Sequence, residues 1–173
     1  MTSSSKSSGG KAGHRRPSGL SAARLLAVQA LYQMTVNKEP AAQVIAEFLK
    51  HRVDEDLEGL KHGAVNRDLM IQLVQGVSEQ ADTLDDMLAA VLDDDWTVER
   101  LEILLLALLR AATFELSERA EVPARVVVSE YVDLANAFFD GRETSFVNGL
   151  LDRLAHILRM EEFGDAGALP DIS

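Results

Sequence analysis

Apolar residues recur along this chain at the three- and four-residue spacing of amphipathic helices, and no stretch alternates with the period of two typical of a strand. The clearest pattern runs from residue 122 to 158, where two amphipathic segments flank a short charged loop. Pro123 stands where a first-turn proline is tolerated, and Thr144 or Ser145 is placed to cap the second segment. The two stripes comprise Val127, Val128, Tyr131, Val132, Leu134, Ala135 and Phe138, then Phe146, Val147, Leu150, Leu151, Leu154, Ile157 and Leu158. The sequence therefore predicts an all-α protein.

Glycine, proline and short charged runs divide the rest of the chain into further helices. We expect a compact bundle of about seven helices in residues 20–160, preceded by a flexible basic arm at 1–19 and followed by a disordered acidic tail at 161–173. The expected earlier helices cover residues 21–36, 41–52, 66–77, 82–92 and 97–118, with a loop at 53–65. At 173 residues the chain is long enough to bury a core.

The segment 97–118 carries apolar residues on every side, with seven in a row before Arg110. Such a helix lies either at the centre of the core or half-exposed at an interface, and the pattern leaves both readings open. A guanidinium in this leucine-rich environment requires a carboxylate partner. Glu115 is five residues away and on the wrong face, so we expect Glu130 in the next helix to pair with Arg110.

Asn148 and Gly149 are weak helix formers inside the last predicted helix. We therefore expect another helix to approach closely at Gly149, where a side chain would obstruct the contact. The pattern V-P-x-x-V-x-x-x-E-x-V-x-L-A, followed by F-V-N-G-x-L-D, covers residues 122–152. It resembles the NusB family of transcription antitermination factors.

Two upstream blocks extend the resemblance in the same order as in the family. Residues 24–32 resemble its R-x-x-A-x-Q-A-L-Y helix, and residues 109–116 resemble its L-R-x-A-x-Y-E-L helix, with Phe114 in place of the tyrosine. The resemblance implies two small three-helix bundles packed together. It also implies binding of boxA-type single-stranded RNA jointly with a small-subunit ribosomal protein (NusE). The complex would then act with other Nus factors on RNA polymerase in ribosomal RNA operons, in the cytoplasm.

The resemblance also suggests which residues do the binding. Basic residues would contact phosphates and aromatic rings would stack on bases, although aromatic residues at helical spacing also suit a core. The candidate RNA-binding residues are Arg15, Arg16, Arg24, Gln29, Tyr32, Arg142 and Phe146, and the candidate protein-partner residues are Glu99, Leu105 and Leu106. The family is typically polar around Leu105 and Leu106, so apolar residues there predict a partner surface or a homodimer. A helical protein-interaction module, or a domain related to the N-terminal domains of RNA methyltransferases, is the alternative.

Charge limits how the chain could bind nucleic acid. The first 24 residues hold five basic residues and no acidic one, which leaves 12 basic and 28 acidic residues in the remainder. An acidic body repels phosphate, so RNA binding would depend on the basic arm and on the residues that fold beside it. Family members often carry an arginine cluster directly before the Arg24 position, whereas this chain has Leu20 to Ala23 there. We therefore expect weak RNA affinity without the ribosomal partner.

The sequence offers little for catalysis. The chain contains no cysteine, which excludes disulfides and thiolate chemistry and favours the cytosol. Its four histidines stand in unrelated segments, and the chain lacks the usual phosphate-binding glycine motifs. No apolar run reaches membrane length, and we expect no export signal, cofactor or metal site. The sequence predicts a binding protein rather than an enzyme.

Overall fold

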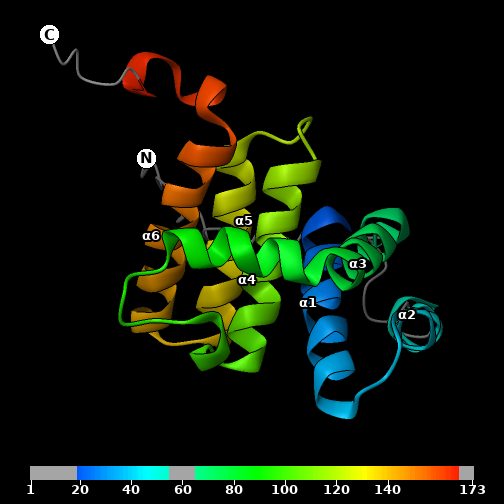
Figure 1. Ribbon diagram of the computed structural model, residues 1–173. Coiled ribbons are helices and arrows are strands. Elements are labelled where there is room, and N and C mark those ends of the chain that lie inside the picture. The colour runs from blue at the N-terminus through cyan, green and yellow to red at the C-terminus, as the bar shows by residue number, and fades with distance from the viewer. Residues whose placement is uncertain (1–18, 55–64, 168–173) are drawn as a thin grey trace, which may run out of the picture.

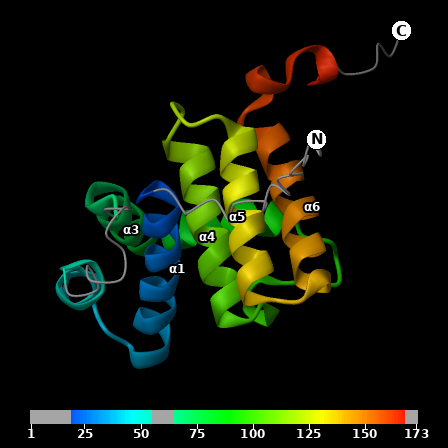
Figure 2. The same ribbon diagram turned by 180° about the vertical axis from the view of Figure 1, so that it is seen from behind.

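A computed structural model describes residues 19–54 and 65–167 of the chain. Within these residues it contains six α-helices and no strand, so the predicted all-α class is confirmed (Figure 1). Two groups of helices are visible, with α1, α2 and the first part of α3 on one side and α4, α5 and α6 on the other, while the rest of α3 runs across α4 toward α6 (Figure 2). Of the predicted arm at 1–19, residues 1–18 lie outside the described residues, and Gly19 is the first residue of α1.

The first group follows the predicted boundaries for its first two helices and departs from them in the third. The helices are α1 (Gly19–Asn37), α2 (Ala41–Phe48) and α3 (Arg67–Val91), and a π-helical segment, Leu49–Asp54, continues α2. The Asn66 side chain caps α3 by accepting the Leu69 N–H at 2.9 Å. The two helices expected at 66–77 and 82–92 are the two segments of α3, which join directly at a kink at Gln80 (φ −113°, ψ 16°), without the short gap that we expected between them.

The second group contains α4 (Ile103–Glu118), α5 (Ala124–Phe138) and α6 (Gly141–Leu158). The prediction of one helix from 97 to 118 is wrong. Val98–Arg100 form a separate 3₁₀ turn, and Leu101 and Glu102 are extended before α4 begins. This interruption of the helix places the side chains of Val98 and Leu101 in the core. Helix α6 begins at Gly141, so Thr144 and Ser145 lie inside it and cap nothing.

Helix α4 is the central helix of the molecule, in contact with α1, α3, α5 and α6. Ten of its residues are buried, which explains why its leucines face every direction. The tightest approach to it occurs at Gly76 of α3, where an added Cβ would overlap the Phe114 ring. The glycine that allows two helices to meet is therefore Gly76. Gly149 is exposed, and a Cβ there would meet nothing within 4 Å, so the prediction of a close approach at Gly149 is wrong.

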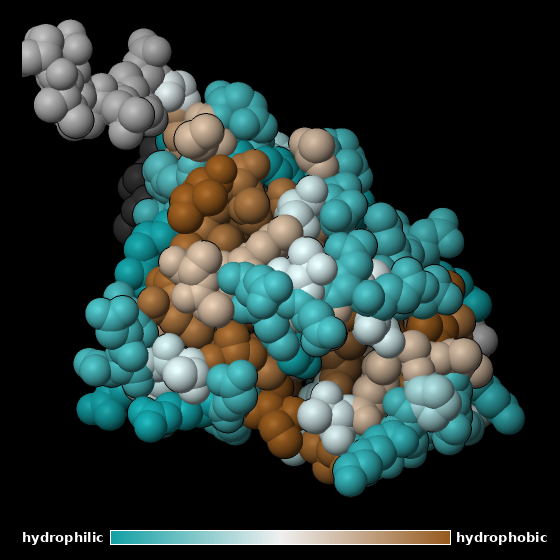
Figure 3. Space-filling model, viewed as in Figure 1, coloured by the Kyte–Doolittle hydropathy of each residue, from teal (hydrophilic) through white to brown (hydrophobic). Residues whose placement is uncertain are grey.

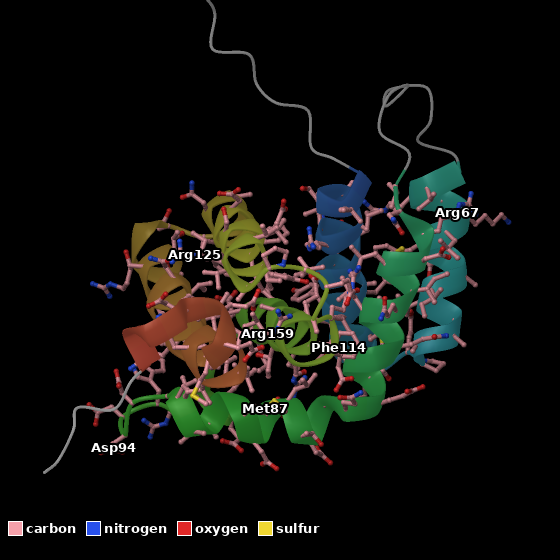
Figure 4. All side chains as sticks on the ribbon, turned by 90° about the horizontal axis from the view of Figure 1, so that it is seen from above. Arg67, Met87, Asp94, Phe114, Arg125 and Arg159 are labelled. Carbon is pink, nitrogen blue, oxygen red and sulfur yellow. The ribbon has the colours of Figure 1, made fainter. Side chains whose placement is uncertain are left out.

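Arg159, just after α6, ties the C-terminal end of α4 to α5 and α6. Its guanidinium is 4% exposed and donates hydrogen bonds to four backbone carbonyls, those of Glu115, Leu116, Arg119 and Val122. Figure 4 shows Arg159 in the middle of the second group of helices. Carbonyls at the end of a helix lack partners within it, so this buried cation caps α4.

A short 3₁₀ segment follows α6 and includes the start of the expected tail. Met160–Gly167 form a 3₁₀ segment with a break at Gly164, and Phe163 stacks on His156 of α6 with ring centroids 3.9 Å apart. Residues 168–173 of the expected tail lie outside the described part of the chain. Among the described helices, none has the length and apolar character needed to span a membrane.

Candidate nucleic-acid interface

Arg24 is the first predicted RNA contact that the structure overturns. Its side chain is 2% exposed and forms a bidentate ion pair with Glu115 of α4, with Nε–Oε2 at 2.8 Å and Nη2–Oε1 at 2.9 Å. The Tyr131 hydroxyl donates to the same carboxylate at 2.6 Å. A buried and paired guanidinium cannot neutralise a phosphate, so Arg24 joins α1 to α4 and α5 instead of contacting RNA.

The chemistry of this buried cluster is set by the Glu115 carboxylate. Burial alone would lower the pKa of Arg24, but the hydrogen bond and charge of Glu115 outweigh burial, and the net shift is upward. Burial and the negative charge of Glu115 together raise the pKa of the Tyr131 hydroxyl well above its ordinary value. Tyr131 therefore remains a neutral hydroxyl that donates to the Glu115 carboxylate.

The expected Arg110–Glu130 ion pair is also wrong. Arg110 pairs with Asp85 of α3, and Nε and Nη2 each lie 2.7 Å from a carboxylate oxygen. Glu130 instead accepts the Ser21 hydroxyl at 2.7 Å and lies 3.8 Å from Arg24 Nη1. The reason is geometric: Arg110 lies on the side of α4 that packs on α3, whereas Glu130 of α5 lies near the start of α1.

On α1, the remaining predicted RNA contacts are accessible. Tyr32 is 41% exposed and Gln29, one turn earlier on the same face, is half-buried. Tyr32 is therefore available for stacking, and it is not the core residue that its spacing also suited. Arg15 and Arg16 lie outside the described residues.

On α6, Arg142 is exposed and Phe146 is half-buried one turn later. The Phe146 ring lies 5.9 Å, between centroids, from the ring of Trp96, which is 49% exposed in the turn between α3 and the 3₁₀ helix. The sequence analysis did not single out Trp96, although it is the only tryptophan in the chain. Its exposure and its contact with Phe146 depend on the fold, so the only sequence signal was a lone tryptophan directly after three aspartates.

The predicted RNA residues on α1 and α6 are not in one cluster. Helix α4 lies between α1 and α6 and contacts both. The C-terminal half of α1 and the N-terminal half of α6 nevertheless point to the same end of the molecule, the lower end in Figure 1. Apolar surface also appears at the lower end of that view in Figure 3.

Of the three predicted protein-partner residues, two are accessible and one is buried. Glu99 is exposed and Leu106 is half-buried, but Leu105 is only 7% exposed. Leu105 packs in the core, so its assignment to a partner surface or dimer interface is wrong. The most accessible apolar residue near the start of α4 is Ile103, which is 42% exposed.

A separate groove lies between α5 and α6, and neither Trp96 nor Phe146 lines it. Its volume is about 480 Å³, and Arg125, Val128, Ser129, Val132, Asp133, Asn148, Asp152, His156 and Phe163 line it. The groove therefore contains Asn148 but neither Arg142 nor Phe146. In residues 19–54 and 65–167, no three His, Asp or Glu side chains converge as a metal site would require.

The described residues form an all-helical fold that exposes Tyr32 on α1, Trp96 before the 3₁₀ turn and Arg142 on α6. Comparison with known proteins identifies the family. The NusB family model matches residues 21–156. The transcription antitermination protein NusB of Sphingopyxis alaskensis is 46% identical over 146 residues, which cover 84% of this chain and 98% of that protein. The chain belongs to the NusB family.

Further relatives support this membership. The transcription antitermination protein NusB of Rhizobium leguminosarum bv. trifolii is 43% identical over 140 residues, covering 81% of this chain and 88% of that protein. The solved structure of NusB from T. maritima superposes with a TM-score of 0.69 at 26% identity, covering 83% of this chain and 95% of that one.

Proposed function

We propose that this protein is a transcription antitermination factor. It binds boxA-type single-stranded RNA together with a small-subunit ribosomal protein that serves as the transcription factor NusE. In the cytoplasm, this complex acts with other Nus factors on RNA polymerase to suppress premature termination in ribosomal RNA operons. The protein acts by binding and has no catalytic role.

One observation carries the RNA assignment. Tyr32 belongs to the C-terminal half of α1, and Arg142 and Phe146 belong to the N-terminal half of α6; these two helix halves point to the same end of the molecule (Figure 1). Tyr32 and Arg142 are exposed, and Phe146 is half-buried. Single-stranded RNA is held by cations that contact phosphates and by aromatic rings on which bases stack. This end of the molecule offers both kinds of group, which fits an unpaired strand better than a duplex.

The charge balance explains why a protein partner is needed. The net formal charge is −11, and the structure removes Arg24 from the basic residues available to RNA. The acidic body therefore repels phosphate, and a few arginines offset that repulsion only in part. A basic ribosomal protein bound beside the RNA would supply the missing positive charge. The exposed Glu99 and the apolar Ile103 near the start of α4 suit such a partner.

Binding of a fluorescently labelled boxA-type strand, measured by anisotropy with and without the ribosomal protein, tests this proposal. We expect weak binding to this protein alone and clearly tighter, mutually dependent binding when both proteins are present. The same strand annealed to its complement is the control, and it should bind more weakly. If the two proteins associate without any effect of RNA, the chain is a protein-interaction module and the proposal fails.

A further inference from the structure

One exposed stripe of α6 runs alongside the turn that carries Trp96. Arg142, Phe146, Gly149 and Arg153 follow one another at intervals of four, three and four residues, so they share one face of the helix. The stripe is about 16 Å long at 1.5 Å per residue. It therefore has an arginine at each end, the Phe146 ring near one end, and Gly149, which has no side chain, between Phe146 and Arg153.

The turn is held against this stripe at two points. Arg153 Nη1 lies 3.2 Å from Asp93 Oδ1, and the Trp96 ring contacts Phe146. The turn itself is closed by the Trp96 N–H, which donates to the Asp93 carbonyl at 2.9 Å, and Arg100 donates to the Asp95 carbonyl at 3.4 Å. Trp96 is therefore positioned before any ligand arrives, while about half of its surface remains exposed.

Gly149, in the middle of this stripe, is a second and independent indication of a ligand. Glycine in a helix interior costs about 1 kcal/mol relative to alanine, and a Cβ at this position would meet nothing within 4 Å. Packing within the protein thus gives no reason for glycine here. A ligand lying directly on the helix backbone, between Phe146 and Arg153, does give one.

We propose that Trp96, with Phe146, forms a two-ring platform on which a base of single-stranded RNA stacks, while Arg142 and Arg153 contact the flanking phosphates across Gly149. This proposal rests on the RNA-binding function proposed above and assigns Trp96, Gly149 and Arg153 to it. Asp94 and Asp95 directly precede Trp96 and repel phosphate. Trp96 therefore contributes to RNA binding by stacking, and the attraction of the RNA phosphates comes from Arg142 and Arg153.

The ion pair between Arg153 and Asp93 does not prevent this role. Both side chains are largely exposed, at 49% and 73%, and exposed pairs of this kind are weak and easily screened. A phosphate can therefore replace the Asp93 carboxylate. An Asp93→Asn variant frees Arg153 and should bind RNA more tightly than an Asp94→Asn variant, which removes the same charge from the same turn. Equal affinities would show that only net charge matters and would remove Arg153 from the site.

The single tryptophan provides a direct readout of the platform. In the full chain with the ribosomal protein, titration with a boxA-type strand is followed by Trp96 emission and by anisotropy of a label on the RNA. Any tryptophan of the ribosomal protein is first replaced by phenylalanine. Stacking should quench Trp96 emission over the same concentration range as binding. Trp96→Ala should weaken binding about fivefold or more, since stacking on one base is worth at least about that factor.

Controls separate this proposal from the proposed function. Ile157→Ala removes a comparably exposed apolar side chain near the other end of α6 and should leave affinity within about twofold of the wild type. Trp96→Phe should keep most of the affinity. If RNA binds but Trp96 emission and Trp96→Ala affinity do not respond, this platform is wrong while the RNA-binding function stands. If the ribosomal protein alone produces the full quench, Trp96 belongs to a protein interface. If no RNA binds, both proposals fail.

Discussion

Arg24 of α1 and Glu115 of α4 form a bidentate ion pair inside the protein, and the Tyr131 hydroxyl of α5 completes it. Because the pair crosses between the two groups of helices, it fixes α1 relative to α4 and α5. The position of Tyr32, further along α1, depends on that arrangement. A buried pair thus supports the binding surface without touching a ligand.

Removing one member of this pair should strongly destabilise the protein. Arg24→Met leaves the buried Glu115 charge without its main partner, which typically costs about 3 to 5 kcal/mol. Urea denaturation followed by circular dichroism measures the change in the free energy of unfolding. Arg153→Met is the matched control, because it removes an exposed ion pair and should cost less than about 1 kcal/mol. Similar losses in the two variants would contradict the interior role of Arg24.

The partner of Arg110 can be identified by a double-mutant cycle. Arg110 makes two short hydrogen bonds to the half-buried Asp85, and bonds between charged groups contribute about 1.5 to 3 kcal/mol. We therefore expect a positive coupling energy between Arg110→Gln and Asp85→Asn in denaturation experiments. The corresponding cycle with Glu130→Gln should give a coupling near zero. A larger coupling to Glu130 would restore the pairing that the sequence suggested.

Tyr131 should give the protein a specific sensitivity to alkaline pH. Its pKa in the folded state is raised well above 10.0 by burial and by Glu115, whereas the unfolded tyrosine ionises near its ordinary value. The unfolded state therefore loses a proton that the folded state keeps, and stability falls as pH rises above about 10. Below about pH 10 the stabilisation that the protonated Tyr131 provides is fully present.

Denaturation of the wild type and of Tyr131→Phe between about pH 8 and 11 tests this assignment. The variant should be less stable near neutral pH, because Glu115 loses a hydrogen-bond donor. Its stability should fall less steeply above pH 10 than that of the wild type. Parallel pH profiles would show that Tyr131 ionises equally in both states.

The basic arm should contribute most of the salt dependence of RNA binding. Residues 1–18 contain Lys6, Lys11, Arg15 and Arg16 and no acidic residue. Each phosphate that these cations neutralise adds about 0.7 to the slope of log affinity against log salt for a single strand. Deletion of residues 1–18 should therefore lower both affinity and slope. An unchanged slope would mean that the arm does not contact RNA.

The fold was predictable because helical periodicity depends on local sequence. The stripes of α5 and α6 are strong and predicted both helices, although α6 begins at Gly141, before the predicted caps Thr144 and Ser145. The sequence did predict a break near Gln80, but not that the two segments join there without a gap, and the turn before α4 was missed. Packing against other helices decides whether a polar residue ends a helix or only bends it.

The site was harder to predict, because pairing partners come from distant parts of the chain. Arg24 shares a helix face with Ala27, Val28 and Leu31, so the sequence did contain a signal that it is buried. Its partner Glu115 is 91 residues away, and no local pattern joins the two. Trp96 likewise reaches Phe146 only because a turn after α3 folds back along α6.

The central claim is that RNA binds at the end of the molecule where α6 begins. Charge reversal at two exposed arginines tests it most directly, since Arg142 lies on the proposed stripe and Arg125 lines the groove between α5 and α6. With the ribosomal protein present, Arg142→Glu should weaken binding of the boxA-type strand about fivefold or more and lower the salt slope by about 0.7. Arg125→Glu, with the same change in charge, should stay within about twofold of the wild type. Equal losses, or a greater loss for Arg125→Glu, would contradict this location of the RNA site.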